Sequence, residues 1–130
     1  MIFGDLLENK VHIHALDRAA GYLEFKQARV RWFLSINYDT IPYEVTKTGQ
    51  RTYRSIKVNG EEIEFSNGFT DLHTESYKDI LQQNGFGLED ARMSIEIVHD
   101  IRNGEIENLQ GDYHPFVKLP ETEHPFSQTF

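Results

Sequence analysis

Residues 68–104 read GFTDLHTESYKDILQQNGFGLEDARMSIEIVHDIRNG, and this stretch decides the fold. Its apolar residues recur at helical spacing in two segments, which predicts two amphipathic helices. In the first segment these residues are Phe69, Leu72, Tyr77, Ile80 and Leu81. In the second they are Leu88, Ala91, Ile95, Val98 and Ile101. Two helices with one apolar stripe each need a further layer on which to bury those stripes.

The ends of the first helix carry short polar residues and glycine. Thr70 or Asp71 is expected to cap its start, because a short side-chain oxygen accepts a hydrogen bond from the free N–H groups of the first turn. Asn84-Gly85 is expected to end it, since both residues tolerate the left-handed conformation that often closes a helix.

Alternation of apolar and polar residues predicts strands ahead of the helices. The expected strands cover 11–15, 21–25, 28–36, 52–58 and 61–65, with a turn at 17–20. Residues 37–50 are expected to form a loop, either without regular structure or with one helical turn. Asn59-Gly60 joins the last two strands, and this dipeptide between alternating runs is a strong hairpin signal. On the longest strand Arg29, Arg31, Phe33 and Ser35 face one way, and Val30, Trp32, Leu34 and Ile36 face the other.

We therefore predict an α+β fold, in which an open, mainly antiparallel sheet carries both helices on one face. The other face is too mixed for a core and too aromatic for plain solvent surface, so we expect it to be free for contact with another subunit. Residues 1–104 form this domain in the prediction. Residues 105–130 contain three prolines and no sustained periodicity, which predicts an extended tail. Residues 1–7 are apolar without a capping residue, which fits either an element that begins upstream or a frayed terminus.

The bulk composition excludes several classes of protein. The chain has 130 residues, enough for about one domain, and no cysteine, which excludes disulfides and thiolate metal sites. Its net charge of −8 argues against nucleic acid or an anionic membrane as a partner. The sequence contains neither an apolar run of membrane-spanning length nor a secretory signal. We expect a cytoplasmic protein.

Arg29 and Arg31 are candidate binding residues, because both project from the same side of the central strand. The guanidinium group offers forked donors that suit carboxylate or phosphate. The alternative is pairing with cross-strand glutamates, Glu24 among them, or contact with another subunit. His73 lies in the first turn of the first helix, where it either points into a cleft or is half-buried and hydrogen-bonded nearby.

Two further patterns are interpreted as structural. His12 and His14 are expected on one face of a strand, but no third ligand of clear spacing accompanies them, so we favour solvent-facing or interface histidines over a metal pair. Residues 85–87, Gly-Phe-Gly, lack a third glycine and follow a helix, which predicts a tight turn rather than a dinucleotide loop. We therefore predict no metal site and no catalytic residue in this chain.

Several longer runs carry a resemblance to a known family. They include GYLEF at 21–25, ARVRWFLSI at 28–36, VNGEEIEF at 58–65, GFGLEDAR at 85–92 and GDYHPF at 111–116. These runs resemble the C-terminal half of UDP-N-acetylglucosamine 3-dehydrogenases, which act on UDP-N-acetylglucosamine or its uronic acid in the making of bacterial surface polysaccharides. Such enzymes belong to the glucose–fructose oxidoreductase, inositol dehydrogenase and MocA superfamily. That superfamily joins an N-terminal Rossmann domain to a C-terminal α+β domain, and this sequence resembles only the second.

The resemblance implies a substrate-binding and oligomerisation domain of an NAD-dependent oxidoreductase. It implies oxidation of the C3 hydroxyl of a UDP-amino sugar, with this domain inert alone. The sequence lacks the Gly-x-Gly-x-x-Gly motif and the motifs with the family's catalytic lysine and histidine, so NAD and the UDP-sugar are expected to bind only with the missing Rossmann domain.

By position in the family, Arg29 and Arg31 fall on the strand that approaches the substrate, and His73 falls at a helix start near the same site. The two arginines fit a subunit contact equally, and the open sheet face would form a homo-oligomer. The resemblance also implies that the chain opens on a helix. A different hypothesis is a non-enzymatic binding or scaffolding module that retains the dehydrogenase fold.

Overall fold

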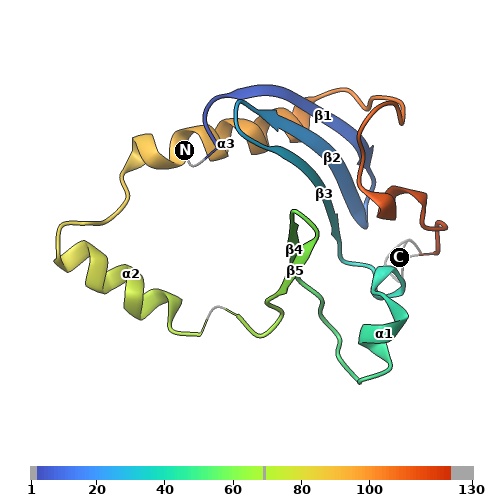
Figure 1. The fold of residues 1–130 in the computed structure, drawn as a ribbon, viewed down its shortest axis with the longest axis horizontal. Helices are drawn as coiled ribbons and strands as arrows, with labels where there is room; N and C mark the ends of the chain where they lie inside the picture. The colour runs from blue at the N-terminus through green and yellow to red at the C-terminus, as the bar shows by residue number, and fades with distance from the viewer. Residues whose placement is uncertain (1–2, 69, 124–130) are drawn as a thin grey trace, which may run out of the picture. The chain divides into compact units, whose positions relative to one another are not determined.

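The computed structural model describes residues 3–68 and 70–123. The chain divides into two units, whose helices and strands are labelled in Figure 1. The first comprises Met1–Thr40 with Glu89–Phe130, and the second comprises Ile41–Leu88. Within the described residues, no helix has the length and apolar character needed to cross a membrane.

The first unit is built on a three-stranded antiparallel sheet. Its strands are β1 (Leu6–His14), β2 (Arg18–Phe25) and β3 (Arg29–Ser35), in the order β1-β2-β3. The central strand β2 is the most buried, with Ala20 at 0% and Tyr22 at 5% exposure. Gly21 has no room for a side chain, because a Cβ there would lie 2.2 Å from the Lys10 carbonyl oxygen and 2.6 Å from the Trp32 ring.

Two strands of this sheet are longer than the alternation predicts. β1 begins at Leu6 and includes the polar run Glu8-Asn9-Lys10, while β2 begins at Arg18, inside the predicted turn. Residues 3–5 form a turn and a bend, so the described chain does not open on a helix. The prediction missed these ends because backbone pairing between β1 and β2 continues where side-chain alternation has already stopped.

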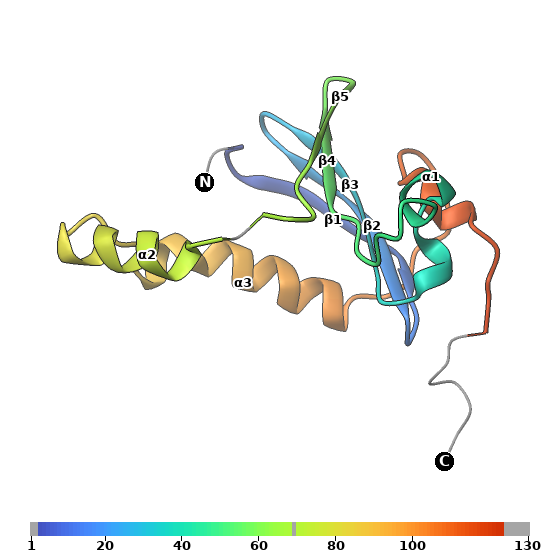
Figure 2. The same ribbon diagram turned by 90° about the horizontal axis from the view of Figure 1, so that it is seen from below.

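Helix α3 (Leu88–Asn103) covers one face of the sheet (Figures 1 and 2). The Asn9 side-chain amide donates to the Ile97 carbonyl across 3.4 Å. The most buried residues of the helix are Met93, Ile97 and Ile101, at spacings of four. The predicted stripe is therefore correct only at Ile101. Ile95 and other members of it are exposed, because the narrow sheet takes up only one line of side chains from the helix.

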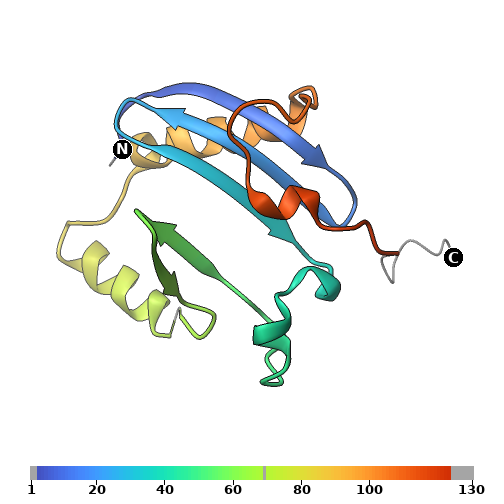
Figure 3. The ribbon, with the colours of Figure 1, turned by 45° about the vertical axis from the view of Figure 1, so that its right-hand side comes forward.

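After α3 the chain passes to the opposite face of the sheet (Figure 3). Ile106 forms an isolated parallel bridge with Val11 at the sheet edge. The 3-10 helix η2 (Pro115–Lys118) follows. The Phe33 ring stacks on His114 at 5.7 Å between ring centroids. We call residues 112–122 the strap. The face opposite α3, predicted to be free, is therefore partly covered by the chain itself.

The second unit contains a short helix α1 (Tyr43–Thr46), a hairpin and the helix α2 (Leu72–Leu81). The hairpin strands are β4 (Ser55–Val58) and β5 (Glu61–Glu64), which form a separate two-stranded sheet. Asn59 and Gly60 have φ angles of 50° and 92°, as a two-residue hairpin turn requires, so the predicted hairpin is confirmed. The α+β class is confirmed, although its five strands divide into two sheets.

The boundaries of α2 differ in detail from the prediction. Asp71 occupies the position before the helix with a φ of 61°, but its side chain makes no capping hydrogen bond. At the other end the left-handed residue is Gln83, with a φ of 63°, rather than Asn84 or Gly85. The apolar residues of α2, including Tyr77, are exposed. Phe69, the first residue of the predicted stripe, lies outside the described residues.

Candidate functional site

Arg29 and Arg31 lie on the sheet face opposite α3. They pair in register with Glu24 and Tyr22 of β2, so all four side chains lie on one face. The side chains of Arg29 and Arg31 are 70% and 55% exposed. The local sequence produces this arrangement because strand side chains alternate, which places residues two apart on the same face.

Each arginine of this face already has a carboxylate partner. Arg29 Nε lies 3.6 Å from Glu24 Oε1, and Arg31 Nη1 lies 3.6 Å from Asp112 Oδ1. Tyr22 donates a hydrogen bond of 3.2 Å to Glu24, and burial together with the Glu24 charge raises the Tyr22 pKa. Exposed ion pairs this long contribute little to stability. Both guanidinium groups are therefore available to an anion that displaces these carboxylates.

His73 is placed differently from the two arginines. It is the second residue of α2 and is exposed. It therefore belongs to the second unit, while Arg29 and Arg31 belong to the first. The alternative that His73 is half-buried and hydrogen-bonded nearby is therefore wrong, because the side chain is exposed.

A bulge in β1 separates the environments of His12 and His14. The register of β1 against β2 shifts between Val11 and Ile13, and such a shift breaks the alternation of faces. His12 is 5% exposed and meets the edge of the Tyr113 ring, whereas His14 is exposed. Among the described residues no group of three or more His, Asp or Glu is suited to hold a metal.

The strap contributes residues that the sequence prediction treated only as a tail. His114 Nδ1 accepts a hydrogen bond of 3.1 Å from the Phe116 backbone N–H. The Phe116 ring meets Phe33 edge-on at 5.6 Å. Burial, and to a lesser extent the Arg31 charge, lowers the His114 pKa. The available signal was the GDYHPF run at 111–116, whose aromatic residues are unusual in an extended tail.

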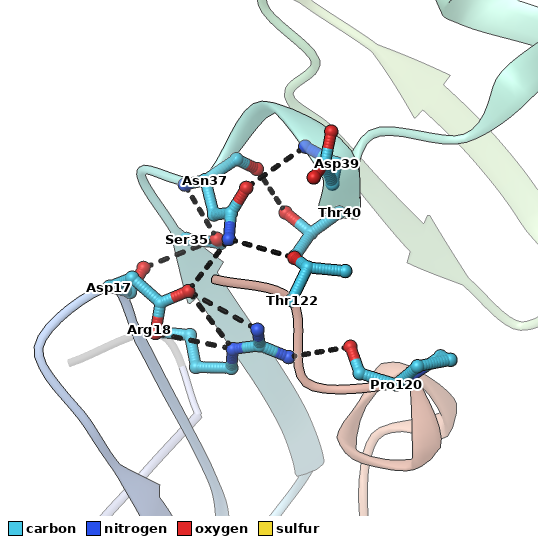
Figure 4. Close-up of polar contacts among 8 residues, drawn as sticks. All are labelled: Asp17, Arg18, Ser35, Asn37, Asp39, Thr40, Pro120 and Thr122. Atoms are coloured by element: carbon cyan, nitrogen blue, oxygen red, sulfur yellow. Dashed lines mark hydrogen bonds and ion pairs between the residues drawn. The ribbon is translucent and has the colours of Figure 1, made fainter. Parts of the chain in front are cut away.

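A buried polar cluster fixes the far end of the strap (Figure 4). Arg18 and Asp17 form a salt bridge of 3.2 Å, with side chains only 5% and 10% exposed. Arg18 Nη1 also donates to the Pro120 carbonyl at 3.4 Å. Asn37 Nδ2 donates to Asp17 at 3.0 Å and to Thr122 Oγ1 at 3.1 Å. Hydrogen bonds from Asn37 and Arg18 lower the Asp17 pKa, so the carboxylate stays ionised and holds the cluster together.

The described residues do not fit a dinucleotide. A dinucleotide site is built from parallel strands joined by a helix, with a glycine-rich turn at the helix start. Every strand pairing in residues 3–68 and 70–123 is antiparallel, apart from the single bridge of Val11 and Ile106. Gly85 and Gly87 precede α3 but follow the helix α2, as the sequence predicts for a turn between helices.

Comparison with known proteins shows that this chain is similar in sequence and structure to part of a dehydrogenase. No family model matches the chain. The WlbA (WbpB) dehydrogenase from Thermus thermophilus, solved with NAD and alpha-ketoglutarate, is 47% identical to it with a TM-score of 0.83. The same dehydrogenase solved with NAD and UDP-GlcNAcA gives 44% identity and a TM-score of 0.83. Each match covers 88% of this chain and 37% of the dehydrogenase chain. The predicted resemblance is confirmed, and this chain spans little more than a third of its relative.

Proposed function

We propose that this chain, a dehydrogenase-type domain, is the substrate-binding and oligomerisation domain of an NAD-dependent oxidoreductase of UDP-amino sugars. The observation that carries the proposal is the 47% identity to one part of the WlbA (WbpB) dehydrogenase. The reaction would be oxidation of the C3 hydroxyl, in the cytoplasmic steps of surface-polysaccharide synthesis. NAD would be held by a separate Rossmann domain, since the described residues do not fit it.

The role proposed for the sheet face follows from its charge. A UDP-sugar carries a negatively charged diphosphate, and a uronic acid adds a carboxylate. Arg29 and Arg31 would bind these groups with forked donors in place of Glu24 and Asp112. His73 is the third proposed substrate residue, on grounds of its position in the family alone.

Calorimetric titration of the 130-residue chain tests the division of labour. We expect no heat of NAD binding from the chain alone. A chimaera with this chain in place of the matching part of the Thermus dehydrogenase is expected to form NADH with UDP-GlcNAcA. The Arg31→Ala change in that chimaera should lower kcat/KM by about 10-fold or more, because a charge-assisted hydrogen bond is lost. Tight NAD binding by the isolated chain would contradict the proposal.

Self-association is a separate part of the proposal. In their alternative role, Arg29 and Arg31 would meet a second copy of the chain rather than the substrate, so light scattering should report a dimer or larger oligomer. The Arg29→Glu change should weaken that association, while Lys78→Glu on the exposed helix α2 serves as the control. A monomer at high concentration would exclude the proposed self-association and leave the proposed substrate binding by the two arginines unaffected.

The alternative is a non-enzymatic binding or scaffolding module with the dehydrogenase fold. This alternative shares with the oxidoreductase proposal the misfit between the described residues and a dinucleotide, so that misfit alone does not separate the two. Sequencing the DNA upstream of the Met1 codon separates the two, because an in-frame Rossmann domain supports the oxidoreductase and a stop codon with a promoter supports the module.

A further inference from the structure

The strap is held to the sheet by two attachments of different chemistry. The polar cluster around Arg18 and Asp17 holds Pro120 and Thr122. An aromatic attachment holds the other end, where His114 and Phe116 pack on Phe33. Only the second attachment contains groups that titrate near neutral pH.

The geometry of His114 requires a neutral ring. Its Nδ1 accepts the hydrogen bond from the Phe116 N–H at the start of η2, and a protonated Nδ1 has no lone pair to offer. The ring stacks on Phe33 with 25° between the ring planes and meets Phe116 edge-on at 5.0 Å, so a charge on it would be partly removed from water. Protonation therefore replaces one hydrogen bond with a repulsion between two N–H groups.

His12, which lies beneath the strap, must also be neutral while the strap is closed. It is 5% exposed against Tyr113, and neither ring nitrogen has a hydrogen-bond partner among the described residues. Burial lowers its pKa. An imidazolium at this position would be desolvated without a partner, which is costly. Movement of Tyr113 away from the sheet would open His12 to water.

The charged groups around the two histidines do not cancel this effect. For His114 they are Arg31, which lowers its pKa, together with Asp112 on Arg31 and Lys118 over the Tyr113 ring. For His12 they are Glu107, which raises the pKa, and Lys10, which lowers it and is itself paired with Glu8. Desolvation is the largest influence in both cases, and its direction is the same.

We propose that the strap is a pH-sensitive clasp, in which residues 112–118 leave the sheet as the pH falls while Pro120 and Thr122 remain anchored by Arg18 and Asn37. Release frees Arg31 from Asp112 and uncovers Phe33 on the sheet face. The direction of the switch follows from linkage. A histidine whose pKa is lower in the closed state favours closure fully above its ordinary pKa of about 6.5, and this advantage is lost as the pH falls below that value.

Hydrogen exchange of the strap amides in the full chain tests the clasp between pH 7.5 and 5.5. The reporters are the Phe116, Val117 and Leu119 amides, which donate to His114 Nδ1, the His114 carbonyl and the Phe116 carbonyl. After correction for intrinsic rates, we expect their protection to fall by up to about 10-fold per pH unit for each histidine. Amides of β2 should keep their protection. Constant strap protection overturns the proposal, and so does a parallel loss in β2, since that reports unfolding of the whole unit.

Substitution of His114 by Asn sharpens the test. The Asn side-chain oxygen still accepts from the Phe116 N–H but does not titrate, so the pH dependence should fall to that of His12 alone. The matched control is His99→Asn, because His99 is exposed on α3 and is expected to leave the wild-type dependence unchanged. An unchanged pH dependence in His114→Asn overturns the assignment to His114.

A measurement on the wild-type chain keeps the proposal open to refutation if the variant does not fold. NMR titration of the histidine ring carbons should give His12 and His114 pKa values below about 6.5. Values at or above that level for both rings overturn the clasp.

Discussion

The two units contain equally regular sequence patterns but differ in what they bury. In the first, the sheet lies between α3 on one face and the strap on the other, and Ala20 has 0% exposure. In the second, Ser66 is the only buried residue among those described. Ile56 and Ile63 pair across the hairpin yet are 55% and 59% exposed. Periodicity therefore predicts the element, whereas burial depends on a second layer to cover it.

The largest loss of stability is expected from a glycine-to-alanine change in the first unit, and the same change in the second unit should have a smaller effect. Gly21→Ala should destabilise the first unit by about 3 kcal/mol, because the new methyl group overlaps the Lys10 carbonyl and the Trp32 ring. Gly85→Ala should change stability by less than about 1 kcal/mol, since its nearest neighbour is the flexible Ile80 side chain at 3.1 Å. Urea unfolding followed by fluorescence of Trp32, the single tryptophan, measures the first change, and circular dichroism measures the second. Equal effects would show that the two units are packed alike.

The next largest loss of stability is expected from an isoleucine-to-alanine change in α3, compared with the same change in α2. Ile97→Ala removes the buried isoleucine of α3 and should cost about 2 kcal/mol. Ile80→Ala on α2 removes a side chain that is 56% exposed and should cost less than about 0.5 kcal/mol. Thermal unfolding of both variants measures the difference. A large loss for Ile80→Ala would mean that a partner covers α2 in solution.

The hairpin turn should respond more weakly than the packed core. Gly60 has a φ of 92°, and a Cβ added there would meet no atom within 4 Å, so Gly60→Ala acts through backbone strain alone. We expect a loss of about 1 kcal/mol, confined to the NMR signals of β4 and β5. Glu61→Ala beside it is the control. An effect that spreads to β2 would contradict the division of the chain into two units.

The smallest effect is expected in acid. The Asp17 pKa is lowered from its ordinary value of 3.8, so this carboxylate stabilises the first unit above that pH and the stabilisation is lost as the pH falls through the lowered value. Asp17→Asn should therefore narrow the difference between urea midpoints at pH 7 and pH 3. Asp39→Asn, on an exposed neighbouring residue, is the control. An unchanged difference in Asp17→Asn would exclude the polar cluster as a source of acid sensitivity.

Local signals in the sequence predicted the elements that rest on local physics. Alternation gave β3, the Asn59-Gly60 dipeptide gave the hairpin, and apolar spacing gave α2 and α3 within a few residues. In the candidate site, the shared face of Arg29 and Arg31 also followed from alternation. These features depend on a residue and its near neighbours, so they can be predicted from the local sequence pattern.

Other features were missed because distant residues create them. The bulge that buries His12 comes from the register of β1 against β2. The role of His114 depends on Phe33, far away in the sequence. Which apolar side chains of α3 are buried depends on the side of the helix that packs against the sheet. None of these has a local signature.

The sequence by itself determined the α+β class, the position of the hairpin and both helices, and the resemblance to a dehydrogenase domain. Only the tertiary structure decided that the strap covers part of the sheet face, that Arg18 and Asp17 are buried beneath its end, and that His12 and His14 have different surroundings. The physical reason is that turns and amphipathic periods arise from neighbouring residues, whereas burial and side-chain pairing are set by segments that meet only after the chain has folded.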